Sequence, residues 1–166
     1  YLDANSGLWN QCAGFDHPGL IEVAKKQYEK FAGYHSLFGR LSEETLELSN
    51  KLIEVSPFDQ GRVFFCNSGS EANETALKLA RLHANNKKLK NPKIIIFDKS
   101  WHGRTIATLS ATGNKSVQAG FKPLISGFVK CQLNDMKAVK KVINNNNVSA
   151  VILETIQGEG GIRIAE

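Results

Sequence analysis

Residues 67–71, Asn-Ser-Gly-Ser-Glu, have the composition and the setting of a phosphate-binding turn. The apolar run before them, residues 62–66, is predicted to be a buried strand, and a strongly helical sequence follows. The first amides of a helix have no partner within the helix and carry partial positive charge, so they attract anions. Gly69 would let the backbone turn sharply and approach such an anion closely.

The same residues fit a purely structural alternative. Ser68 and Glu71 have the Ser-x-x-Glu spacing of a capping box, which closes a helix start without any ligand. The turn matches neither the Gly-x-x-x-x-Gly-Lys-Ser/Thr pattern of a P-loop nor the Gly-x-Gly-x-x-Gly pattern of a dinucleotide fold. A phosphate held here is therefore expected to belong to neither ATP nor NAD.

A second chemical group follows the predicted strand at residues 93–97. Trp101, His102, Gly103 and Arg104 bring an indole, an imidazole, a flexible joint and a guanidinium together in four positions. The indole could stack on a planar ring, and the guanidinium could hold a carboxylate through two parallel hydrogen bonds. The alternative is that Trp101 packs in the core and Arg104 forms a surface ion pair.

A third polar segment surrounds two carboxylates. Glu154 and Glu159 lie five residues apart around a glycine-rich turn. Its glycines are Gly158, Gly160 and Gly161. Paired carboxylates can act as general acid and base. Because nothing nearby indicates glycoside hydrolysis and the glycines indicate close backbone packing, we expect these carboxylates to position other groups.

These three segments need a scaffold that brings them together. Apolar and β-branched runs alternate with helical patterns, which is typical of a parallel sheet covered on both faces. The predicted fold is α/β, a three-layer αβα sandwich, in which loops at the carboxyl ends of the strands meet in one crevice. Helices are expected from Pro18, from Ser42 and over residues 71–85 and 135–143, and strands over residues 1–7, 62–66, 93–97 and 148–153.

Composition narrows the possible functions. The 166 residues carry a net charge of +5, but the excess lies in lysine clusters without interleaved aromatics, so nucleic-acid binding is not predicted. The three cysteines are widely spaced, which suits reduced thiols in the cytoplasm and predicts neither a metal site nor a disulfide. No apolar run approaches the roughly 20 residues needed to cross a membrane. The chain opens at Tyr1 and stops at Glu166 just after a glycine-rich segment, so we expect part of a longer protein.

Taken together, the three segments resemble those of class III aminotransferases, which use pyridoxal 5′-phosphate (PLP) and adopt the fold-type I architecture. The resemblance covers nearly the whole chain, is strongest to the acetylornithine branch, and continues through residues 109–114. It implies that residues 1–40 are an N-terminal segment with the start of the large domain, and residues 41–166 the first part of the PLP-binding large domain. The rest of that domain and a C-terminal small domain would then be absent.

The resemblance also implies roles for individual residues. Gly69 and Ser70 match positions that contact the PLP phosphate, and Trp101 matches an aromatic that stacks on the pyridine ring, followed by His102. Glu154 matches a residue near the cofactor. Substrate-binding positions are matched by Arg104, for the α-carboxylate, and Glu159, which in relatives acting on ω-amines can pair with an arginine. No catalytic residue is expected here, because the Schiff-base lysine and its partner aspartate would lie beyond Glu166.

The implied activity is transfer of the terminal amino group of N-acetylornithine to 2-oxoglutarate in arginine biosynthesis, by a cytoplasmic homodimer. The alternative substrate is 4-aminobutyrate or another ω-amino acid, because residues 6–9 and 33–40 are similar to the ω-amino-acid:pyruvate branch. Trp101 stands where Phe or Tyr is usual, and Thr155 where Pro is common. Two further alternatives are a PLP-dependent aminomutase or decarboxylase, and a non-catalytic module that kept the fold.

Overall fold

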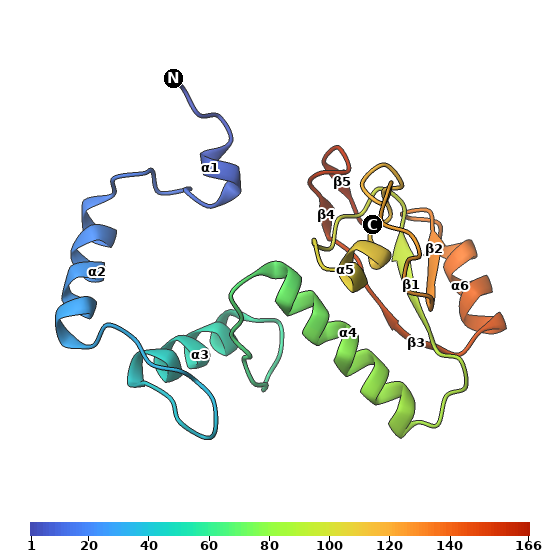
Figure 1. Ribbon diagram of the computed structural model, residues 1–166, viewed down its shortest axis with the longest axis horizontal. Coiled ribbons are helices and arrows are strands. Elements are labelled where there is room, and N and C mark those ends of the chain that lie inside the picture. The colour runs from blue at the N-terminus through green and yellow to red at the C-terminus, as the bar shows by residue number, and fades with distance from the viewer. The chain divides into compact units, whose positions relative to one another are not determined.

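The computed structural model describes residues 1–166, which form two compact units, residues 1–64 and residues 65–166. The first unit contains three helices, α1 (Ser6–Trp9), α2 (Pro18–Lys30) and α3 (Glu43–Val55). The second contains a three-stranded sheet, a two-stranded hairpin and three helices (Figure 1). None of the helices combines the length and the apolarity that crossing a bilayer requires.

Helices α2 and α3 begin where the sequence predicts. Pro18 occupies the first turn of α2, where its missing N–H and fixed φ are favourable. The hydroxyl of Ser42 caps α3 by accepting a hydrogen bond from the Thr45 amide at 3.3 Å. Two glutamates in the first turn of α3, Glu43 and Glu44, complement the positive end of the helix dipole.

The prediction of a strand over residues 1–7 is wrong. The carboxylate of Asp3 accepts hydrogen bonds from the amides of Asn5 and Gly7, at 2.8 and 2.7 Å, and folds the chain back on itself. Positive φ angles follow, 61° at Gly7 and 70° at Leu8, so α1 is a single tight turn. The hydrogen bonds from the backbone to the Asp3 side chain therefore favour a turn over an extended strand at residues 1–7.

The second unit is built around a parallel sheet with the order β2-β1-β3. The chain enters it through a long helix and reaches each further strand by a crossover that contains a helix. The elements in order are α4 (Gly69–Asn86), β1 (Lys93–Phe97), α5 (Ile106–Ala111), β2 (Phe128–Cys131), α6 (Met136–Asn145) and β3 (Val148–Val151). The hairpin of β4 (Ile156–Gln157) and β5 (Arg163–Ile164) follows the last of these strands.

The sheet has a helix layer on each face, which is the predicted αβα arrangement. Ile95 and Phe97 of β1 pack with Val139 of α6 on one face. Ile94 lies on the other face, where it shares a cavity wall with Leu77 of α4 and Ala107 of α5. Figure 1 shows α6 and α5 on opposite sides of β1 and β2. The carboxyl ends of β1 and β3 both lead into the polar segments that the sequence singled out.

The prediction of a strand over residues 62–66 is also wrong. Residues 62–66 form no strand, and both edges of β1 are occupied by β2 and β3. A strand is defined by ladder hydrogen bonds to a neighbour, and apolar character alone does not supply them. The segment nevertheless leads directly into α4, so the turn before that helix keeps its predicted place.

Candidate functional site

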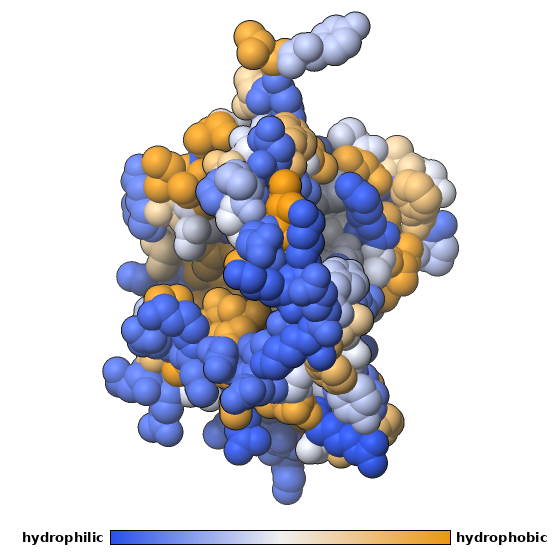
Figure 2. Space-filling view, turned by 90° about the vertical axis from the view of Figure 1, so that its left-hand side faces the viewer, coloured by the Kyte–Doolittle hydropathy of each residue, from blue (hydrophilic) through white to orange (hydrophobic).

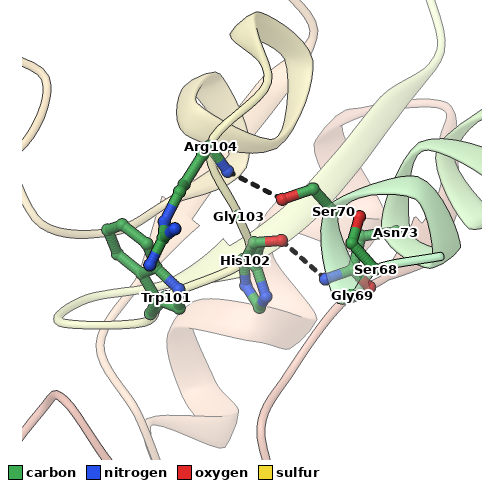
Figure 3. A pocket seen from close by; sticks show the side chains of 8 residues that line it. All are labelled: Ser68, Gly69, Ser70, Asn73, Trp101, His102, Gly103 and Arg104. Atoms are coloured by element: carbon green, nitrogen blue, oxygen red, sulfur yellow. Dashed lines mark hydrogen bonds between the residues drawn. The ribbon is translucent and has the colours of Figure 1, made fainter. Parts of the chain in front are cut away.

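A pocket of about 480 Å³ lies between the start of α4 and the loop that follows β1. Figure 3 shows the side chains that line it. Five of the lining residues are site residues predicted from the sequence: Gly69, Ser70, Trp101, His102 and Arg104; the others are Ser68, Asn73 and Gly103. Two turns that are distant in the sequence therefore share one cavity.

The start of α4 is capped by side chains, and its first backbone amides form no bond within the helix. The Ser68 hydroxyl accepts a hydrogen bond from the Glu71 amide at 3.2 Å, while the Glu71 carboxylate accepts one from the Asn67 amide at 2.7 Å. The capping alternative is thus partly correct. In a capping box the Glu71 carboxylate would accept from the Ser68 amide, but here it accepts from the Asn67 amide, one residue earlier. Backbone bonding in α4 begins with the Ala72 amide, so the amides of Gly69 and Ser70 are available to a ligand.

The loop after β1 presents Trp101 and Arg104 to the same cavity. Trp101 is half-buried rather than a core residue, and Arg104 is exposed. Arg104 forms no ion pair, so the structural alternative considered for it is not observed. An unpaired guanidinium beside an aromatic ring can receive a carboxylate.

His102 is buried, and its Nε2 atom has no hydrogen-bond partner. Burial lowers the pKa of His102, so the ring is neutral at neutral pH. The backbone of the residue is fixed at both ends, because its amide donates to the Thr112 hydroxyl at 3.2 Å and its carbonyl accepts from the Asn73 side chain at 2.6 Å. His102 lines the pocket, and an unpartnered buried polar atom on such a residue calls for a partner.

Glu154 is bonded to the backbone of the loop that carries Trp101. One carboxylate oxygen accepts a hydrogen bond from the Trp101 amide at 2.9 Å, although the two residues are far apart in sequence. Burial raises the pKa of Glu154, and the nearby charge of Glu159 adds to this, while hydrogen bonds from the Trp101 and Gly158 amides oppose it. Glu159 itself is exposed, and neither glutamate lines the pocket.

A polar network that the sequence analysis did not predict anchors the segment with Glu154. The fully buried side chain of Gln157 donates to the Asp98 carbonyl at 2.8 Å and accepts from Arg163 at 3.1 Å. Arg163 also donates to the Asp98 carboxylate at 3.1 Å. A Cβ at Gly160 would lie 2.8 Å from the Lys99 carbonyl oxygen. Gly160 is therefore packed closely against the backbone, as the sequence predicts.

The pocket lining defines the kind of ligand that fits. Helix amides and the Ser70 hydroxyl suit a phosphate, the Trp101 ring suits a planar heterocycle, and Arg104 suits a carboxylate. Fold and site together describe an α/β protein with a cavity suited to a phosphorylated planar ring and a neighbouring carboxylate.

The comparisons with known proteins agree with this description. The family Aminotransferase class-III matches residues 1–166. The acetylornithine aminotransferase of Nitrosomonas europaea is 43% identical over all of this chain and 42% of its own length, and that of Aquifex aeolicus is 41% identical over 99% and 43%. The PMP-bound form of an aminotransferase from Vibrio fluvialis superposes with a TM-score of 0.91 at 38% identity, covering 99% of this chain and 41% of the other.

The chain belongs to the class III aminotransferase family, whose members depend on PLP. The predicted family and fold are thereby confirmed. The chain spans about two fifths of the length of the curated relatives that it matches. The pocket suits the family's cofactor, because the first residues of α4, the half-buried indole of Trp101 and His102 all line one cavity.

Proposed function

We propose that the full-length protein transfers the terminal amino group of N-acetylornithine to 2-oxoglutarate, with PLP as cofactor. The observation that carries this proposal is the single pocket that joins the first turn of α4 to Trp101 and Arg104. The similarity to acetylornithine aminotransferases at 40–43% identity supports the choice of substrate.

Each side chain has a distinct task in this proposal. The Gly69 and Ser70 amides and the Ser70 hydroxyl bind the phosphate, and Trp101 covers one face of the ring. Bound there, the cofactor supplies the electron sink that amino transfer requires. Arg104 binds the α-carboxylate of the substrate and so orients the carbon that exchanges its proton. The Glu154 carboxylate accepts a hydrogen bond from the Trp101 amide and thereby fixes the position of the indole.

His102 and Glu159 complete the proposed site. A neutral His102 can offer Nε2 to the cofactor or to a group that the cofactor brings, because burial lowers the pKa of His102 and so disfavours the second ring proton. Glu159 lies exposed near Glu154, where it is available to an arginine or to an amine-bearing substrate. We include in the proposal a cytoplasmic homodimer, with residues 41–166 as the first part of the PLP-binding large domain.

A second candidate substrate class is supported by the solved structures. An ω-aminotransferase from Paracoccus denitrificans has a TM-score of 0.90 at 38% identity, covering 99% of this chain and 41% of the other. The alternative activity is therefore transfer from 4-aminobutyrate or another ω-amino acid.

The test uses the full-length protein with PLP and 2-oxoglutarate. Glutamate formation with N-acetylornithine would support the proposal, and faster formation with 4-aminobutyrate would support the alternative. A protein that binds PLP but forms no glutamate with either donor would contradict both and favour an aminomutase or a decarboxylase.

The role of Arg104 has its own test. Arg104→Ala should raise KM for N-acetylornithine and lower kcat/KM by a factor that corresponds to about 2 to 4 kcal/mol. Arg81→Ala is the matched control, because Arg81 is an exposed arginine on α4 outside this pocket. An unchanged KM in Arg104→Ala would remove Arg104 from the substrate site.

A further inference from the structure

One face of α4 is bonded to the loop that carries Trp101 and Arg104. Ser70, Asn73 and Glu74 are spaced three and four residues apart, so their side chains leave the helix on the same side. All three bond to the loop after β1. Figure 3 shows the two bonds that Ser70 and Asn73 form with the backbone of this loop. Sequence analysis assigned a role to the first of these residues only.

The three bonds fall on three different residues of the loop. The Asn73 side-chain amide donates to the His102 carbonyl at 2.6 Å, and the Ser70 hydroxyl oxygen accepts from the Arg104 amide at 3.0 Å. The Thr105 hydroxyl donates to the Glu74 carboxylate. Helix α4 therefore holds the loop at His102, Arg104 and Thr105, which leaves these residues little freedom to shift.

Close packing between the two segments has the same effect. Gly103 lies between two of the bonded residues with a φ of +139°, a conformation that favours glycine. A Cβ at this position would lie 2.7 Å from the Ser70 hydroxyl oxygen and 2.7 Å from that of Thr108. The loop thus rests directly on the helix, and the Asn73 bond determines where along the helix it rests.

We infer that Asn73 and Glu74 are positioning residues that set the distance between the phosphate end and the ring end of the cofactor site. This inference rests on the proposed function. The phosphate contacts belong to α4, whereas Trp101 and Arg104 belong to the loop, and the cofactor between them has a fixed length. The bonds from α4 to the loop therefore fix the separation of two walls that must fit one rigid molecule.

The deciding variant is Asn73→Asp in the full-length protein. It keeps the size of the side chain, but it replaces the donor with a carboxylate oxygen that faces the His102 carbonyl. We expect the Kd for PLP to rise about tenfold and KM for the α-carboxylate substrate to rise more than kcat falls. The visible circular dichroism of bound PLP, measured at saturation, should change, because it reports the placement of the ring.

The controls separate positioning from a general loss of stability. Asn85→Asp introduces the same change at an exposed asparagine near the other end of α4 and should leave the affinity, the dichroism and KM unchanged. Asn73→Gln retains the donor and should recover part of the PLP affinity. Asn73→Ala, which removes the donor without adding charge, is the second variant if Asn73→Asp does not fold.

A readout without cofactor tests the same contact. Arg104 is exposed, so trypsin can cleave after it once the loop detaches from α4. The Asn73→Asp protein without PLP should be cleaved at the Arg104–Thr105 peptide bond faster than the wild type. The masses of the fragments identify this cleavage. A wild type that does not bind PLP would overturn the proposed function. A wild type that binds PLP, together with variants of unchanged affinity, dichroism and cleavage rate, would overturn this inference.

Discussion

The two units of the chain differ in where their apolar side chains lie. In residues 1–64 no residue is buried, and apolar side chains of α2 and α3 such as Ile21 and Leu52 are exposed. In residues 65–166, Ile95 and Ile96 of β1 are buried between helix layers. Figure 2 shows apolar side chains interspersed with hydrophilic ones on one face of the surface.

The difference shows that local and non-local signals determine different elements. Helix α3 has a serine cap and an acidic first turn, and these suffice to define its start without any buried contact. Strand β1 has no comparable local signal beyond three isoleucines, and it depends on β2 and β3 to complete its hydrogen bonds. Stability should therefore respond to substitutions in the second unit far more than in the first.

The largest effect is expected from a single added methyl group. Gly113→Ala places a Cβ that would overlap the Phe97 carbonyl oxygen at the end of β1, so we expect a loss of more than about 4 kcal/mol or failure to fold. Gly33→Ala is the matched change in the first unit, where a Cβ meets no atom within 4 Å. Denaturant unfolding of both variants measures the contrast, and equal losses would break the comparison.

A smaller contrast is expected between two isoleucines. Ile95→Ala empties a fully buried position and should cost about 2 to 5 kcal/mol. Ile21→Ala on α2 removes a side chain that is 45% exposed and should change stability by less than about 0.5 kcal/mol. If Ile21→Ala costs as much as Ile95→Ala in the full-length protein, the apolar face of α2 is covered there by other residues.

The smallest contrast concerns two ion pairs, one expected to respond to pH and the other to salt. Burial alone would raise the pKa of Asp98, but the Leu133 amide and the Arg163 guanidinium outweigh it and hold that pKa below its usual value. The resulting stability is present above the ordinary aspartate pKa of about 3.9 and is lost as the pH falls through the lower folded value. Asp98→Asn should therefore flatten the decline in unfolding free energy below about pH 4.

The matching pair in the first unit should respond to salt instead. The Nζ atom of Lys30 lies 2.7 Å from the Glu44 carboxylate. Lys30 is largely and Glu44 partly open to water, so their attraction is screened at high ionic strength. Glu44→Gln should lower stability slightly in dilute buffer and not at all in concentrated sodium chloride. A loss that persists in salt would show that this pair is shielded from solvent.

The sequence predicts those elements of the fold that have a helix cap, a helical apolar pattern or a continuous β-branched run. The start of α3 at its Ser42 cap, the bounds of β1 and the course of α6 all agree with expectation. Strand β2 was not predicted, because its four residues include an exposed lysine and it exists through pairing with β1. The strand predicted over residues 62–66 had the right composition but is not formed.

The site was predictable as a set of residue types but not as a set of contacts. The phosphate turn and the Trp101 loop could be identified because their chemistry is concentrated in a few adjacent positions. The bond from Asn73 to the His102 carbonyl joins two segments whose spacing only the fold determines. The position of Asn73 three residues after Ser70 was the available signal, because it places both on one helix face.

The order of strands in the sheet has a consequence for synthesis. The central strand, β1, leaves the ribosome before either of its neighbours, and it stays without a partner until Phe128 and then Val148 have been translated. During that interval three consecutive isoleucines are open to other nascent chains, and unpaired apolar strands of this kind aggregate readily. Production of this protein should therefore benefit from slow expression at low temperature or from added chaperones.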